Sequence, residues 1–119
     1  MRDNFHSKAD GSYCVRTVVP IAYTIPMGST VGELVSWTNI SRMRTAHIHF
    51  AVEAPGYRKV TTHLFRSGDD YLDSDAVYAV KEALIVDFIE KPAGKAPNGE
   101  TMNEPYYEVR YDFILQKAE

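Results

Sequence analysis

Short apolar segments separated by turn signals constrain the fold of this chain more than any other feature. Turn-forming sequences such as Asp10-Gly11, Ala54-Pro55-Gly56 and Ser67-Gly68 recur along it, roughly every eight to twelve residues. The segments between them are rich in β-branched and aromatic residues and show almost no helical period. This pattern is typical of all-β proteins and predicts a β-sandwich of mostly antiparallel strands.

The expected secondary structure follows from these segments. With 119 residues, the chain is expected to form a single domain over residues 1–119. A helical turn is expected within 73–80, and a long Gly-, Pro- and Asn-rich loop near 91–104. Strands are expected at residues 12–19, 32–38, 46–53, 59–65, 83–89 and 106–115.

Charge and cysteine content exclude several classes of function. The chain has 13 Lys and Arg against 16 Asp and Glu, a net charge of −3, which does not favour nucleic acid or an anionic membrane as a partner. Its one cysteine, Cys14, excludes an intrachain disulfide framework and is expected to be a small buried strand residue. Residues 1–10 lack an apolar signal core and no apolar run reaches membrane length. These features predict a cytoplasmic protein.

Two histidines in one expected strand are the strongest candidates for metal binding. In the stretch Arg44-Thr45-Ala46-His47-Ile48-His49-Phe50, His47 and His49 are two residues apart, so on a strand both side chains point to the same face. Imidazole is the commonest metal ligand in proteins. The alternative is that one histidine belongs to the core and the other to the surface. The candidates for further ligands are Tyr23, His63, His6, Asp69, Asp70 and Asp73.

Tyr23 is the candidate ligand whose chemistry would favour one metal ion over others. It lies in an expected loop between Pro20 and Pro26. A phenol with a pKa of about 10 binds as phenolate at neutral pH only to a strongly Lewis-acidic ion such as Fe(III). The single cysteine leaves no thiolate set for a structural zinc site. By its spacing alone, Tyr23 is better interpreted as a core aromatic residue with a satisfied hydroxyl.

Several linked motifs resemble those of the intradiol ring-cleavage dioxygenases, most of all the hydroxyquinol 1,2-dioxygenase branch. The resemblance runs from about residue 5 to residue 115. Besides the histidine stretch, the motifs are Asp10-Gly11-Ser12-Tyr13, Arg16-Thr17-Val18-Val19-Pro20, Tyr23-Thr24-Ile25-Pro26, Val31-Gly32-Glu33-Leu34, Ala54-Pro55-Gly56-Tyr57, Thr61-Thr62-His63-Leu64-Phe65 and Tyr71-Leu72-Asp73-Ser74-Asp75-Ala76-Val77.

The resemblance implies a β-sandwich with a non-haem Fe(III) bound by two tyrosines and two histidines. Tyr23, His47 and His49 resemble three of these ligands, and Arg44 resembles the arginine that faces the bound ring. His63 falls where catechol-type members usually carry glutamine. At this position, the hydroxyquinol-type members resemble this chain. Ala76 and Val77 resemble residues that line the substrate pocket.

The chain also departs from the family pattern. Thr45 stands where a proline usually follows the arginine. The family's first tyrosine ligand and its helical dimerisation segment would fall before Met1. The chain is therefore expected to correspond to the C-terminal part of an intradiol dioxygenase and to form a homo-oligomer that covers the edges left by that segment.

Three functions remain open on this reasoning. The first is a dioxygenase that cleaves hydroxyquinol- or catechol-type aromatic diols with dioxygen. The second is a metal-binding, catalytically impaired protein of the same fold that binds phenols. The third is a β-sandwich interaction module without a metal.

Overall fold

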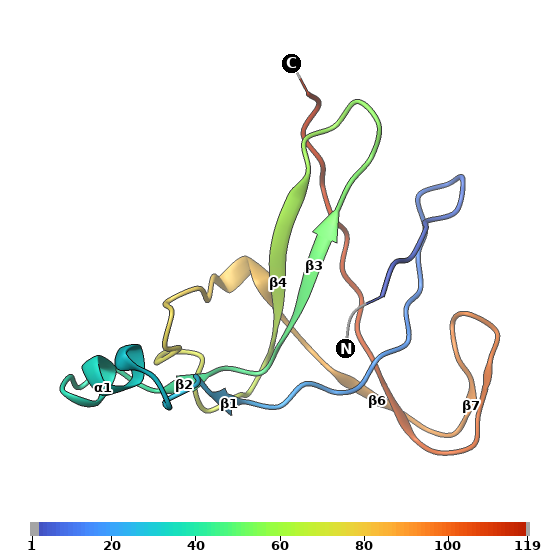
Figure 1. Cartoon of the computed structure of the whole chain (residues 1–119). Coiled ribbons are helices and arrows are strands. Elements are labelled where there is room, and N and C mark those ends of the chain that lie inside the picture. The colour runs from blue at the N-terminus through green and yellow to red at the C-terminus, as the bar shows by residue number, and fades with distance from the viewer. Residues whose placement is uncertain (1–2, 119) are drawn as a thin grey trace. The chain divides into compact units, whose positions relative to one another are not determined.

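Most regular elements are strands in this structure, a computed structural model that describes residues 3–118 (Figure 1). The chain forms two compact units, one made of Met1–Val19 and Ile89–Glu108, the other of Pro20–Phe88 and Val109–Glu119. The elements are β1 (Tyr23–Thr24), α1 (Thr30–Ser36), β2 (Met43–Arg44), β3 (His47–Val52), β4 (Val60–Arg66), η1 (Glu82–Leu84), β5 (Ile85–Val86), β6 (Ile89–Lys91), β7 (Gly94–Lys95), β8 (Thr101–Met102) and β9 (Tyr106–Glu108).

The β3–β4 hairpin is the longest strand pairing and belongs to the larger unit. The two strands are antiparallel, with Val52 opposite Val60 next to the turn. Gly56 adopts φ +78° in this turn, a conformation that favours glycine. β5 adds to β4 in parallel, whereas β1–β2, β6–β9 and β7–β8 are antiparallel. The all-β class and the mostly antiparallel pairing are thus confirmed for the described residues.

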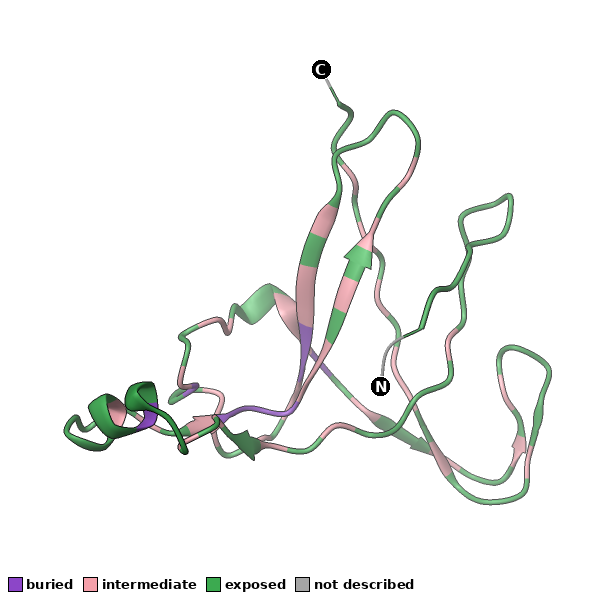
Figure 2. Ribbon diagram, viewed as in Figure 1, coloured by how far each residue is buried: buried purple, intermediate pink, exposed green. Residues whose placement is uncertain are grey.

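The core of the larger unit is small and lies where β3 begins and β4 ends (Figure 2). Its buried apolar residues are Ala46, Leu64, Phe65 and Val86. Phe65 is completely buried, which contributes about 2 kcal/mol. Toward the turn, the residues of both strands are partly buried or exposed.

One expected strand, 32–38, is wrong, because the chain forms helix α1 there. Val31, Leu34 and Val35 follow the three- and four-residue spacing of a helix, and Glu33 in the first turn complements the helix dipole. Gly32 lies so close to a neighbouring loop that an added Cβ would be 2.1 Å from the carbonyl oxygen of Met27.

Other expected elements form only in part or not at all. Residues 12–19 form no strand, and Cys14 is exposed rather than buried. Of the expected strand 106–115, the structure forms the strand β9 at Tyr106–Glu108, which pairs with β6. Within 73–80 there are hydrogen-bonded turns and no helix.

The long loop near 91–104 contains a small hairpin. β7 pairs with β8 around an Asn98-Gly99 turn, in which Gly99 has φ +88°. Asn-Gly is the strongest short signal for such a turn, so this pairing could have been expected from the sequence.

Candidate metal centre

Strands β3 and β4 place three imidazoles on one face of the hairpin. His49 lies directly opposite His63, and His47 lies opposite Phe65. Because residues two apart on a strand share a face, all four rings lie on the same side. Phe65 stacks on His63 with ring centroids 5.5 Å apart, so the buried end of the hairpin supports the imidazoles.

The three histidines form a compact cluster. The Nε2 atoms of His47 and His49 are 3.2 Å apart. The ring centroid of His63 is 4.1 Å from that of His49 and 5.2 Å from that of His47. One ring nitrogen from each residue lies within 4.8 Å of the other two, so the group could hold a metal ion. The expected convergence of His47 and His49 on one face is confirmed.

The orientation of His47 suits metal binding. Its Nδ1 lies 2.6 Å from the carbonyl oxygen of Thr45, which can only accept a hydrogen bond. Nδ1 therefore carries a proton, and Nε2 is the ring nitrogen that lies next to His49. Metal-binding histidines commonly donate their second ring N–H to a carbonyl or carboxylate in this way.

Burial and neighbouring charges keep the other two imidazoles neutral. Burial lowers the pKa of His49 below its ordinary 6.5, and His47 and Arg44 lower it further. Burial also lowers the pKa of His63, with added effects of His49, His47 and Arg44 and a weaker opposing effect of Asp75. Neutral imidazole is the form that ligates a metal, so both residues are ready to do so near neutral pH.

Tyr23 lies beside this cluster. Strand β1 pairs with β2, and Tyr23 is opposite Arg44 in the register. Its ring centroid is 5.7 Å from that of His47, and its exposed fraction is 46%. Its phenol ring is thus accessible and next to an imidazole, so the alternative of a core aromatic residue is wrong.

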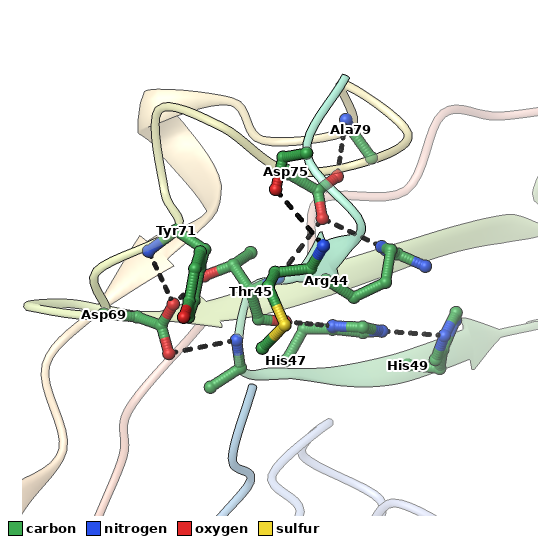
Figure 3. A network of polar contacts seen from close by, with 11 residues as sticks. Arg44, Thr45, His47, His49, Asp69, Tyr71, Asp75 and Ala79 are labelled. Atoms are coloured by element: carbon green, nitrogen blue, oxygen red, sulfur yellow. Dashed lines mark hydrogen bonds and ion pairs between the residues drawn. The ribbon is translucent and has the colours of Figure 1, made fainter. Parts of the chain in front are cut away.

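A buried ion pair holds Arg44 next to the histidines (Figure 3). Arg44 Nε donates to Asp75 Oδ1 at 2.8 Å, and both residues are buried. The Asp75 carboxylate also accepts from the backbone N–H groups of Thr45 at 3.2 Å and Ala79 at 3.1 Å. Arg44 Nη2 is buried and has no hydrogen-bond partner among the described residues. The ion pair fixes the arginine through Nε, and Nη2 is available to donate a hydrogen bond to a ligand.

A second carboxylate holds the segment between Arg44 and His47. Asp69 Oδ1 accepts from Thr45 Oγ1 at 2.8 Å and from the N–H of Tyr71 at 3.0 Å. Its Oδ2 accepts from the N–H of Ala46 at 3.3 Å (Figure 3). Sequence reasoning treated Asp69 as a metal-ligand candidate and missed its structural role. It also missed Asp75, although buried acids near an arginine are almost always paired.

The remaining predicted residues lie outside the histidine cluster. Ala76 donates its N–H to the carbonyl oxygen of Met43 at 2.8 Å, next to Arg44, whereas Val77 is half exposed. Asp70 and Asp73 are exposed turn residues, and His6 belongs to the other compact unit. Among the described residues, the group that could hold a metal contains only His47, His49 and His63.

Comparison with known proteins places this arrangement in a family. Residues 1–117 match the Dioxygenase family. The chain is 40% identical over 118 residues to hydroxyquinol 1,2-dioxygenase of Nocardioides simplex, covering 98% of this chain and 40% of that protein. It is 33% identical over 117 residues to catechol 1,2-dioxygenase of Acinetobacter baylyi, covering 98% of this chain and 38% of that protein.

Solved structures give the same result. The structure of hydroxyquinol 1,2-dioxygenase from Pseudomonas putida DLL-E4 superposes with a TM-score of 0.84 at 43% identity, over 94% of this chain and 40% of that one. The chain belongs to the intradiol ring-cleavage dioxygenase family and matches its C-terminal part. Within the family it is similar to hydroxyquinol 1,2-dioxygenases, and it spans about 40% of the length of these relatives. This likeness also confirms the β-sandwich class.

The described part of the chain contains no helix that is long and apolar enough to span a membrane.

Proposed function

We propose that this chain is the iron-binding part of an intradiol dioxygenase that acts on hydroxyquinol-type aromatic diols with dioxygen. The observation that carries this proposal is the cluster of His47 and His49 with Tyr23 beside it, in a chain whose relatives include hydroxyquinol and catechol 1,2-dioxygenases. Ferric iron, when bound, supplies a Lewis acid and a template for the two diol oxygens.

Each proposed site residue has a distinct task. His47 and His49 provide neutral nitrogen ligands, and Tyr23 provides a phenolate that favours the ferric state. The free Nη2 of Arg44 donates to negative charge that develops on the bound ring. His63, Ala76 and Val77 are proposed to face the substrate, as in the family pattern.

The wider assignments remain predictions. We propose that residues 1–119 act as one catalytic domain, that the protein forms a homo-oligomer, and that it is cytoplasmic. The absence of a nucleic-acid or membrane partner is an expectation from the net charge of −3.

The test is reconstitution of the purified chain with Fe(III). We expect a visible absorption band from tyrosinate bound to iron, which is lost in Tyr23→Phe and kept in the control Tyr107→Phe, because Tyr107 lies in the other compact unit. His47→Ala should weaken iron binding at least on the order of a hundredfold, since loss of a ligand costs no less than loss of its supporting partner.

Oxygen uptake then tests the reaction itself. Hydroxyquinol should support faster uptake than catechol in the iron-loaded protein. A clear preference for catechol would contradict the proposed substrate. Iron binding without uptake for either diol would favour a catalytically impaired, phenol-binding protein instead.

A further inference from the structure

The peptide bond between Thr45 and Ala46 connects the carboxylate of Asp69 to the imidazole of His47. On one side of this peptide, the Ala46 N–H donates to Asp69 Oδ2 at 3.3 Å. On the other side, the Thr45 carbonyl oxygen accepts from His47 Nδ1 at 2.6 Å. A trans peptide is planar, and its N–H and C=O point in opposite directions. A carboxylate that fixes the N–H therefore also fixes the direction of the carbonyl that faces His47.

The side chain of Thr45 restrains this peptide further. Thr45 is completely buried, and its Oγ1 donates to Asp69 Oδ1 at 2.8 Å (Figure 3). The Thr45 N–H donates to Asp75 Oδ1 at 3.2 Å, and the Ala46 carbonyl oxygen accepts from the N–H of Arg66 at 2.9 Å. Because a buried network whose polar groups all have partners is rigid, the Thr45 carbonyl has one orientation.

A carbonyl fixed in this way selects one tautomer of a neutral imidazole. Only one of the two ring nitrogens of neutral histidine carries a proton. When the carbonyl holds that proton on Nδ1 of His47, Nε2 keeps its lone pair. Nε2 is the atom that lies 3.2 Å from the Nε2 of His49. If the carbonyl turned away, the proton could move to Nε2, and His47 could then no longer bind a metal through that atom.

We propose that Asp69 and Thr45 are positioning residues that hold His47 in the Nδ1–H tautomer and so keep Nε2 unprotonated for the metal. The inference rests on the proposed function and deepens it, since His47 is one of the proposed iron ligands. Neither positioning residue has to touch the iron or the diol. Asp69, a candidate metal ligand by sequence, acts through the backbone instead.

Heteronuclear NMR of the metal-free chain at about pH 8, where an ordinary imidazole is neutral, distinguishes the two tautomers. The wild type should show His47 as the Nδ1–H tautomer, with slow exchange of that proton. Thr45→Val, which lacks the hydroxyl, should show a mixture of tautomers and faster exchange, and Thr45→Ser should restore the wild-type signals. The matched control is Ser67→Ala, which removes another hydroxyl–carboxylate hydrogen bond of the same unit, from Ser67 Oγ to Asp87 Oδ1 at 2.6 Å.

A second variant, Asp69→Ala, removes the same contacts from a half-buried residue, so the test does not depend on the fully buried Thr45 alone. Thr45→Val and Asp69→Ala should each weaken Fe(III) binding about tenfold, the lower end of what loss of a supporting partner costs. An Nε2–H tautomer in the wild type, wild-type signals in both variants, or an equal mixture in Ser67→Ala would each overturn the inference. Failure of the tyrosinate band or of oxygen uptake would count against the proposed function and leave the tautomer signals, recorded without iron, unaffected.

Discussion

At the scale of single residues, Asp75 holds the backbone and the arginine around the site in place through its hydrogen bonds. Its two carboxylate oxygens accept from the Arg44 side chain and from the backbone of Thr45 and Ala79. Burial raises the pKa of Asp75, but the hydrogen bonds from Ala79, Arg44 and Thr45 and the charge of Arg44 outweigh it. The net pKa lies below the ordinary value of 3.8. The ionised form is therefore the one that the fold stabilises.

The shifted pKa of Asp75 gives stability a defined pH dependence. Because the pKa is lower in the folded state, the contribution is complete well above pH 3.8 and is lost as the pH falls through the folded value. The free energy of unfolding, measured by urea denaturation, should drop below about pH 4 in the wild type and drop less steeply in Asp75→Asn.

The same substitution should also lower stability at neutral pH. Asp75→Asn leaves the buried Arg44 charge without its partner, which costs about 3 kcal/mol. Asp73→Asn is the matched control, because Asp73 is exposed in the same turn region. Equal stability of the two variants at pH 7 would show that the ion pair does not hold this segment.

At the scale of elements, a close backbone contact positions helix α1 more than apolar burial does. Helix α1 has only seven residues and buries only Gly32. Its position depends on the approach of Gly32 to the backbone of Met27, which no other residue type permits. A glycine inside a helix usually lowers helix stability, so this one is explained by packing.

Gly32→Ala should therefore destabilise the larger unit. An alanine normally stabilises a helix by up to about 1 kcal/mol relative to glycine, but here its Cβ would overlap Met27. The expected net loss is about 1–3 kcal/mol in urea unfolding, the usual cost of overpacking. Gly28→Ala, where an added Cβ meets nothing within 4 Å, should change stability by less than about 0.5 kcal/mol. A stabilised Gly32→Ala variant would contradict the packing argument.

At the scale of the whole molecule, much apolar surface is uncovered. Val31, Leu34 and Trp37 lie along α1 and its end, with exposed fractions of 62%, 54% and 81%. Ile21 and Ile114 are exposed to 76% and 90%. Val31 and Leu34 lie one turn apart on α1, and exposed apolar surface is a site of association, which supports the prediction of a homo-oligomer.

Association should be visible through Trp37, the only tryptophan of the chain. As the protein concentration rises, its emission should shift to shorter wavelength, and sedimentation velocity should show species larger than 13.5 kDa. The double substitution Val31→Glu, Leu34→Lys should reduce both effects, whereas Tyr107→Lys in the other unit should not. A 13.5 kDa species throughout a wide dilution series would exclude self-association.

Local sequence by itself determined the β3–β4 hairpin and the shared face of His47 and His49. Both depend on period-two alternation and on turn residues close in the chain. The turns at Asp10-Gly11, Ala54-Pro55-Gly56 and Ser67-Gly68 could be recognised for the same reason. Linked motifs over most of the chain were sufficient to indicate the family.

Only the tertiary structure decided which distant groups meet. Asp75 reaches Arg44 across 31 positions, and His63 faces His49 through strand register. Residues 12–19 have strand-like composition but form no strand, and 32–38 has an apolar pattern that both a strand and a helix can accommodate. Pairing and packing are long-range properties, so the free energy that selects between such alternatives comes from contacts that no local pattern contains.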